Sequence, residues 1–88
     1  MNKAKMTTIR GIVIPDVWDE VGNVLSVAIF TYQEEKIRVI DDTRGKELKS
    51  HIRKRVSVDG VMSPQGPAEA LRIRYFRIEN DPPDTLKR

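Results

Sequence analysis

Residues 24–40 read VLSVAIFTYQEEKIRVI, and this stretch decides the fold. Two apolar-rich segments, residues 24–32 and 36–40, flank the short polar turn Gln33–Glu35, which is the pattern of an antiparallel β-hairpin. The period of two places Leu25, Val27 and Ile29 on one face of the first strand, and we expect that face to point into the core. The opposite face should then meet solvent.

A helix is predicted to follow this hairpin. The triplet DDT at positions 41–43 is a typical helix start, because its side-chain oxygens can accept hydrogen bonds from the free N–H groups of the first turn. The helix should cover about residues 44–53. Leu48 and Ile52 lie one turn apart there and form a narrow apolar stripe that should face inward.

Three further β-rich segments complete the predicted domain. They are residues 7–17, 56–62 and 69–78. Gly11 and Pro15 predict a bend or bulge in the first of them, and Gly60 predicts a break in the second. The run SPQGP at 63–67 is rich in turn residues and predicts a loop between the last two strands.

The composition agrees with a mostly β chain of one domain. Among 88 residues, Val and Ile number nine each while Leu and Ala number four each, and β-branched residues favour strands. Cysteine is absent and His51 is the single histidine, which excludes disulfides and thiolate sites and argues against a metal centre. No apolar run could span a bilayer and no signal peptide is evident, so we expect a cytoplasmic protein without a membrane role.

The predicted fold is all-β with one short α-helix. The order of three strands, a helix and two strands within about 75 residues predicts a five-stranded Greek-key OB-fold barrel, with the helix between strands 3 and 4. The domain should cover residues 7–78. Residues 1–6 are expected to be a flexible N-terminal arm, and the proline-containing residues 79–88 a disordered tail.

Parts of the chain also resemble OB-fold nucleic-acid-binding domains, including the anticodon-binding and replication-factor types. The stretch RVSVDGV at Arg55–Val61 resembles their fourth strand, and the whole resemblance covers Thr7–Ile78. The other matching residues are Ile9, Gly11 and Val13 in the first strand and Leu71, Arg72, Ile73, Phe76 and Ile78 in the last. The same pattern occurs in small free-standing bacterial proteins. The resemblance implies the fold, and OB-folds bind oligonucleotides, oligosaccharides and other partners.

The outward face of the 24–40 hairpin carries the first candidate site. Phe30 and Tyr32 lie two residues apart, beside Lys36 and Arg38 on the next strand. Single-stranded nucleic acid needs aromatic rings for base stacking and cations for phosphate, and this set provides both. The alternative is that the rings pack against neighbouring apolar residues and the cations only solubilise the strand. Two glutamates at the hairpin tip disfavour phosphate.

Three other residues are candidates. Arg72 and Arg74 share a face of the last strand and could line a phosphate-binding groove, or could protect an exposed strand from edge pairing. Trp18 could stack on a base, or could cover one end of the barrel as a lid. Its acidic neighbours Asp19 and Glu20 would repel phosphate and favour the lid.

Two functions follow, and neither is catalytic. No carboxylate pair, phosphate loop or serine nucleophile motif is present, so we expect no enzyme activity, no cofactor and no metal. The first hypothesis is weak, sequence-tolerant binding of single-stranded DNA or RNA. It draws on the basic segment 36–55, with eight bases and three acids. The second is a protein–protein interaction adaptor, favoured by segment 11–35, with five acids and no base.

Overall fold

A computed structural model describes residues 5–79, which are rich in β-strands. Its elements are β1 (Thr7–Trp18), β2 (Val24–Thr31), β3 (Lys36–Arg38), α1 (Thr43–Leu48), a 3-10 helix (Lys49–His51), β4 (Arg55–Gln65) and β5 (Ala68–Glu79). The short helix lies between the third and fourth strands, as predicted. Most of the predicted arm and nearly all of the predicted tail lie outside the described residues. Within residues 5–79, no helix has the length and apolar character that a bilayer crossing requires.

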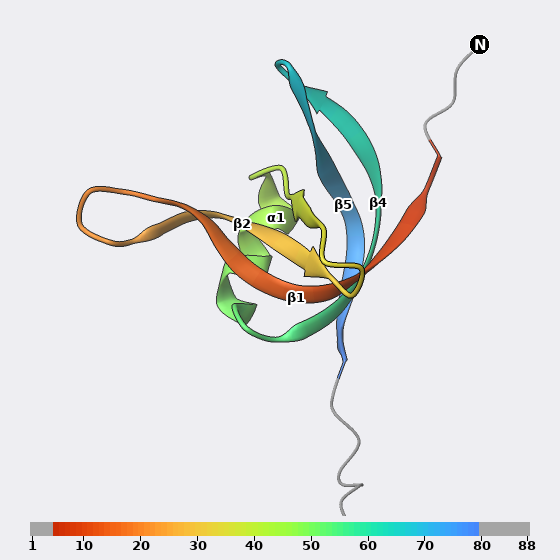
Figure 1. The fold of residues 1–88 in the computed structure, drawn as a ribbon, viewed down its shortest axis with the longest axis horizontal. Coiled ribbons are helices and arrows are strands. Elements are labelled where there is room, and N and C mark those ends of the chain that lie inside the picture. The colour runs from red at the N-terminus through yellow and green to blue at the C-terminus, as the bar shows by residue number, and fades with distance from the viewer. Residues whose placement is uncertain (1–4, 80–88) are drawn as a thin grey trace, which may run out of the picture.

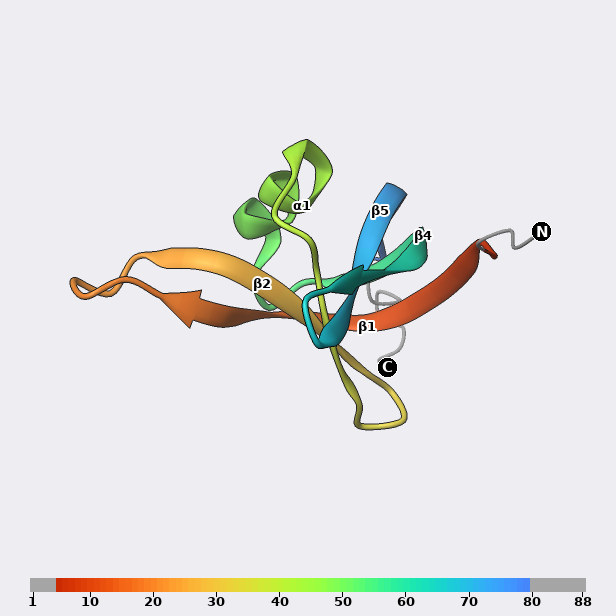
Figure 2. The same ribbon diagram turned by 90° about the horizontal axis from the view of Figure 1, so that it is seen from above.

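The five strands form one antiparallel sheet in the order β3-β2-β1-β4-β5. β1 is the central strand, and it changes partner along its length. Residues Thr7–Ile12 pair with β4, whereas Gly11–Trp18 pair with β2. Because β1 bends between its two partners, the β1–β2 and β4–β5 hairpins project in different directions (Figure 1). Viewed from above, α1 lies on one side of this curved sheet (Figure 2).

The two end strands of the sheet approach each other at one point. Val39, just after β3, forms a parallel β-bridge with Leu71 of β5. The N–H of Ile40 donates to the carbonyl oxygen of Leu71 at 2.9 Å. Between these strands the described sheet is otherwise open, because β3 is only three residues long while β5 has twelve.

The core lies on the concave side of the sheet, beneath α1. Its buried apolar residues are Val13, Val27, Ile29, Val39, Leu48, Val56, Val58, Leu71 and Ile73. β-branched side chains dominate this set, as the composition predicts. Gly11 lets two strands approach closely there, because a Cβ at this position would collide with the carbonyl oxygen of Phe30.

One core prediction in β2 is wrong. Val27 and Ile29 are buried, but Leu25 is 45% exposed. Trp18 pairs with Val24 and the preceding residue of β1 pairs with Ser26, so Leu25 is an extra residue on β2 without a partner. Because of this bulge, the side chains before it point to the opposite face from the one that strict alternation predicts. Val24 therefore packs against the core in place of Leu25.

The helix start is confirmed, but the helix is shorter than predicted. Oδ1 of Asp42 accepts a hydrogen bond from the N–H of Gly45 at 3.0 Å, as an N-cap should. After α1 the chain forms one 3-10 turn and then leaves the helical conformation. The reason is tertiary: the N–H of Arg53 donates to the carbonyl oxygen of Val13 at 2.7 Å, which draws the chain back to β1. Leu48 is fully buried.

The predicted loop at 63–67 is mostly strand. β4 continues to Gln65 and β5 begins at Ala68, so only two residues form the turn. Gly66 has a φ of 64°, a conformation that glycine adopts without strain. The predicted break at Gly60 is present as a register shift between Asp59 and Gly60. Past that shift β4 and β5 form a two-stranded hairpin beyond the end of β1.

Candidate functional site

The convex face of the sheet brings together side chains from all five strands, and we call it the outer face. Strand register places Lys36, Phe30, Ile12, Arg55 and Glu79 in one row across the sheet. The next rows hold Tyr32, Arg10, Ser57 and Arg77, and then Thr8, Asp59 and Tyr75. A row on the other side holds Ile14, Ala28 and Arg38. Residues that alternate with these along the strands belong to the core.

Aromatic side chains are concentrated on this face. The chain has five aromatic residues, and four of them are exposed. Phe30, Tyr32 and Tyr75 lie on the outer face with 41%, 51% and 58% of their surface exposed. A chain with so small a core would gain free energy by burying these rings, yet all three remain accessible to solvent.

Arg10 links two sides of the outer face. Its guanidinium carbon lies 6.0 Å from the centre of the Tyr32 ring, which is cation–π distance. Its Nε and Nη2 donate to the two carboxylate oxygens of Glu79 at 3.1 and 3.3 Å. This hydrogen bond and the carboxylate charge raise the pKa of Arg10. The paired geometry holds the guanidinium beside the ring. The sequence analysis missed Arg10 because Glu79 lies 69 positions away along the chain.

Lys36 and Arg38 lie together, as predicted, but they share a carboxylate. Nζ of Lys36 is 2.7 Å from Oδ1 of Asp16, and Nε of Arg38 is 3.0 Å from Oδ2. The Asp16 side chain is only 5% exposed, whereas both cations are about half exposed. Oδ1 has no well-aligned hydrogen-bond donor among the described residues, and Lys36 balances its charge at ion-pair distance. Asp16 occupies this place because it is an extra residue in β1, between the paired residues Pro15 and Val17.

The other three predicted residues lie outside the rows that cross the outer face. Nη1 of Arg72 is 3.4 Å from Oδ2 of Asp42, at the start of α1. Arg74 lies at the register shift of β5, between the paired residues Ile73 and Tyr75. Trp18 ends β1 and is exposed beside the tip of the β1–β2 hairpin. The structure therefore divides the seven predicted residues into four that lie in the rows across the outer face and three that lie outside those rows.

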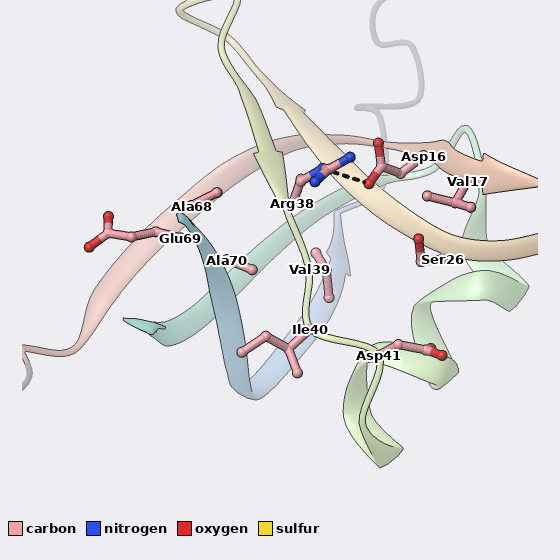
Figure 3. A pocket seen from close by; sticks show the side chains of 10 residues that line it. All are labelled: Asp16, Val17, Ser26, Arg38, Val39, Ile40, Asp41, Ala68, Glu69 and Ala70. Atoms are coloured by element: carbon pink, nitrogen blue, oxygen red, sulfur yellow. Dashed lines mark ion pairs between the residues drawn. The ribbon is translucent and has the colours of Figure 1, made fainter. Parts of the chain in front are cut away.

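A hollow of about 230 Å³ lies between the β1–β2 hairpin, β3 and the start of β5 (Figure 3). Its charged lining comprises three carboxylates, from Asp16, Asp41 and Glu69, and one cation, Arg38. Figure 3 shows Arg38 reaching across to Asp16. An excess of carboxylates repels phosphate, so this hollow is a poor site for a nucleic-acid backbone. In the part of the chain that is described, no group of three metal-binding side chains is assembled here or elsewhere.

A second, polar pocket lies on the outer face itself. Thr8, Ser57, Asp59, Tyr75 and Arg77 line a volume of about 230 Å³. The hydroxyl of Thr8 donates to Oδ1 of Asp59, and Tyr75 lies opposite Asp59 on β5 and interacts with the same carboxylate. These two interactions lower the pKa of Asp59, and the interaction with Asp59 raises the pKa of Tyr75.

This pocket was missed by the sequence analysis. Asp59 occurs in the sequence patterns only within the stretch RVSVDGV, and the candidate residues of the last strand are the arginines Arg72 and Arg74. One signal was available: Tyr75 and Arg77 alternate with the core residues Phe76 and Ile78 and so share an outward face.

Comparison with known proteins assigns no function to this site. None of the protein-family models scanned matches the chain. Searches of curated proteins and of solved structures found no match either.

Proposed function

We propose that this chain is a non-catalytic, OB-fold-like module that binds single-stranded nucleic acid on its outer face. The element order, with one helix between the third and fourth strands, supports the fold. A barrel requires that the two end strands meet, and the bridge between Val39 and Leu71 is such a contact. The sheet would then be a barrel closed at one bridge.

One observation carries the functional proposal: three exposed aromatic rings alternate with five cations on a single sheet face. The rings belong to Phe30, Tyr32 and Tyr75, and the cations to Arg10, Lys36, Arg38, Arg55 and Arg77. Every base has a π-face on which such a ring can stack, and every linkage carries a charge that a cation can meet. Phe30 and Tyr32 lie two residues apart, about 7 Å along the strand, so each can hold a separate base.

The charge balance predicts weak binding. Asp16, Asp59 and Glu79 lie on or beneath this face and offset part of its positive charge. If about two or three phosphates of the strand are neutralised, the slope of log K against log salt should lie between about −1.4 and −2.1, at ~0.7 per phosphate. We therefore expect micromolar or weaker affinity that falls with salt.

The test is a titration with oligo-dT and oligo-U of about nine nucleotides, a length within the range that one OB-fold holds. Fluorescence anisotropy of a labelled strand would be followed at low salt and at increasing salt. The proposal predicts saturable binding that weakens with the stated slope. If neither strand binds at ~20–50 mM salt, where counterion release is most favourable, the proposal is wrong.

A protein-interaction adaptor is the second candidate, and the β1–β2 hairpin favours it. Four of the large apolar side chains exposed in the described chain lie on this hairpin: Val17, Trp18, Val21 and Leu25. Trp18 and Val21 line one shallow hollow at its tip, next to two acidic side chains. Exposed apolar surface rimmed by charge is typical of protein contacts. Under this alternative, alanine at Trp18 and Val21 would abolish partner binding.

A further inference from the structure

In the polar pocket of the outer face, neighbouring side chains hold the carboxylate of Asp59 in place but leave some of its hydrogen-bond acceptor positions free. The hydroxyl of Thr8 donates to Oδ1 of Asp59, and Tyr75 lies opposite Asp59 on the other neighbouring strand. A carboxylate offers about four acceptor positions, so at least about two remain for a ligand. The two flanking residues fix the orientation of the group before any ligand arrives, which lowers the entropic cost of binding.

The chemistry around this carboxylate combines three properties. Asp59 is a pure acceptor, Arg77 is a pure donor, and Tyr75 is an exposed ring beside both. Guanine has two adjacent donors, N1–H and the 2-amino group, on the same edge as the acceptor O6. Adenine, cytosine and thymine have no two adjacent donors on that edge. A carboxylate can therefore accept a bidentate pair from guanine alone.

We infer that the pocket of Thr8, Asp59, Tyr75 and Arg77 is a guanine-selective subsite of the single-strand path. Asp59 accepts from N1–H and the 2-amino group, Arg77 meets O6 or the adjoining phosphate, and Tyr75 contacts the face of the base. This inference rests on the proposed function and adds a sequence preference to it. The remaining path, over Phe30 and Tyr32, stays tolerant of sequence.

The experiment compares four strands of about nine nucleotides. One contains only thymidine, and the others carry a central guanine, inosine or adenine. Anisotropy titrations at low salt should show the guanine strand binding about tenfold more tightly than the thymidine strand, the effect of one bidentate pair partly exposed to water. Inosine lacks the 2-amino group and should lose most of that gain. Adenine should bind like thymidine.

The protein variants distinguish the loss of the Asp59 carboxylate from a general change in net charge. In Asp59→Asn the preference for guanine should fall to within about twofold, because the amide offers one acceptor and one donor. Glu69→Gln makes the same change in net charge outside the pocket and should keep the full preference. Tyr75→Phe keeps the carboxylate but removes the hydroxyl that interacts with it, and should reduce the preference for guanine severalfold. This variant tests the subsite if Asp59→Asn fails to fold.

The outcomes are distinguishable. If the thymidine strand binds and guanine brings no gain, or if folded Asp59→Asn keeps the preference, the guanine subsite is wrong while the proposed function stands. If no strand binds the wild-type protein, both proposals fail. Circular dichroism of each variant establishes that it is folded.

Discussion

Arg38 and Asp16 form an ion pair across the bulge of β1, with Nε 3.0 Å from Oδ2 and the carboxylate almost entirely buried. Lys36 approaches the other oxygen of the same carboxylate. One acid therefore offsets two cations that an approaching phosphate would otherwise meet. The positive charge available on this edge of the outer face is consequently lower than the sequence indicates.

Replacing Asp16 with Asn should raise nucleic-acid affinity while lowering stability. The variant frees one positive charge, so the salt slope should steepen by up to ~0.7. It also removes charge-assisted contacts, which should cost about 1–2 kcal/mol in the free energy of unfolding. Urea unfolding and salt-dependent anisotropy measure the two effects. Unchanged or weaker binding by the folded variant would contradict the prediction.

Removing an aromatic ring from the outer face should weaken binding without changing its salt dependence. Phe30→Ala or Tyr32→Ala should each cost ~1–3 kcal/mol of binding free energy, the value of one base stack. The slope should stay the same because no charge is lost. Trp18→Ala is the matched control, since Trp18 is also exposed but lies on the hairpin tip. An equal loss in the control would show that exposed rings act without regard to position.

Removing a cation from the outer face should change the salt dependence of binding, which the loss of an aromatic ring leaves unchanged. Arg77→Ala should reduce the magnitude of the salt slope by ~0.7, because one phosphate contact is lost. Arg74→Ala changes the net charge equally but lies outside the paired rows of the outer face. We expect the control to keep the wild-type slope. Titrations at four or more salt concentrations distinguish them, and equal slopes for the two variants would refute this assignment of the face.

Two leucines should differ sharply in their contribution to stability. Leu48 of α1 is fully buried, and Leu48→Ala should cost about 2–5 kcal/mol through lost transfer energy and a cavity. Leu25 is 45% exposed at the bulge of β2, and Leu25→Ala should cost under about 1 kcal/mol. Chemical denaturation gives both values. A larger loss for Leu25 than for Leu48 would mean that the register of β2 is misassigned.

The stability of the chain should decrease at acid pH partly through Asp59. Its folded pKa lies below the ordinary value of about 3.9 because Thr8 and Tyr75 hydrogen-bond the ionised form. A lowered pKa gives stability that is present above the unfolded pKa and is lost as pH falls through the folded pKa. Thr8→Val should raise the Asp59 pKa toward its ordinary value and flatten the acid side of the stability profile. Carboxyl NMR titration measures the pKa, and an unchanged value in the variant would contradict the assigned hydrogen bond.

Tyr75 shifts in the opposite sense. Its pKa is raised because its hydroxyl donates to Asp59, which disfavours the phenolate. The corresponding stability is present below the ordinary value of about 10 and is lost as pH rises through the folded pKa. The absorbance of the phenolate during an alkaline titration measures the pKa of Tyr75. Tyr32 is the second tyrosine of the chain and contributes to the same signal.

The sequence by itself determined the order and type of the elements. Strand alternation around Val27 and Ile29, the cap at Asp42 and the break at Gly60 are local signals, because each depends on residues only a few positions apart. Leu48 could be assigned to the core for the same reason. The alternation also places Phe30 and Tyr32 on one face of their strand, but only the structure shows that both rings are exposed.

Only the tertiary structure decided which charges and rings share a surface. Arg10 meets Glu79 and Thr8 meets Asp59 across 69 and 51 positions of sequence, so no local pattern could pair them. The bulges in β1 and β2 add one residue to each strand, which exposes Leu25 and places Asp16 between two cations. Register between distant strands is set by the packing of the whole sheet, and a shift of one residue moves a side chain to the other face.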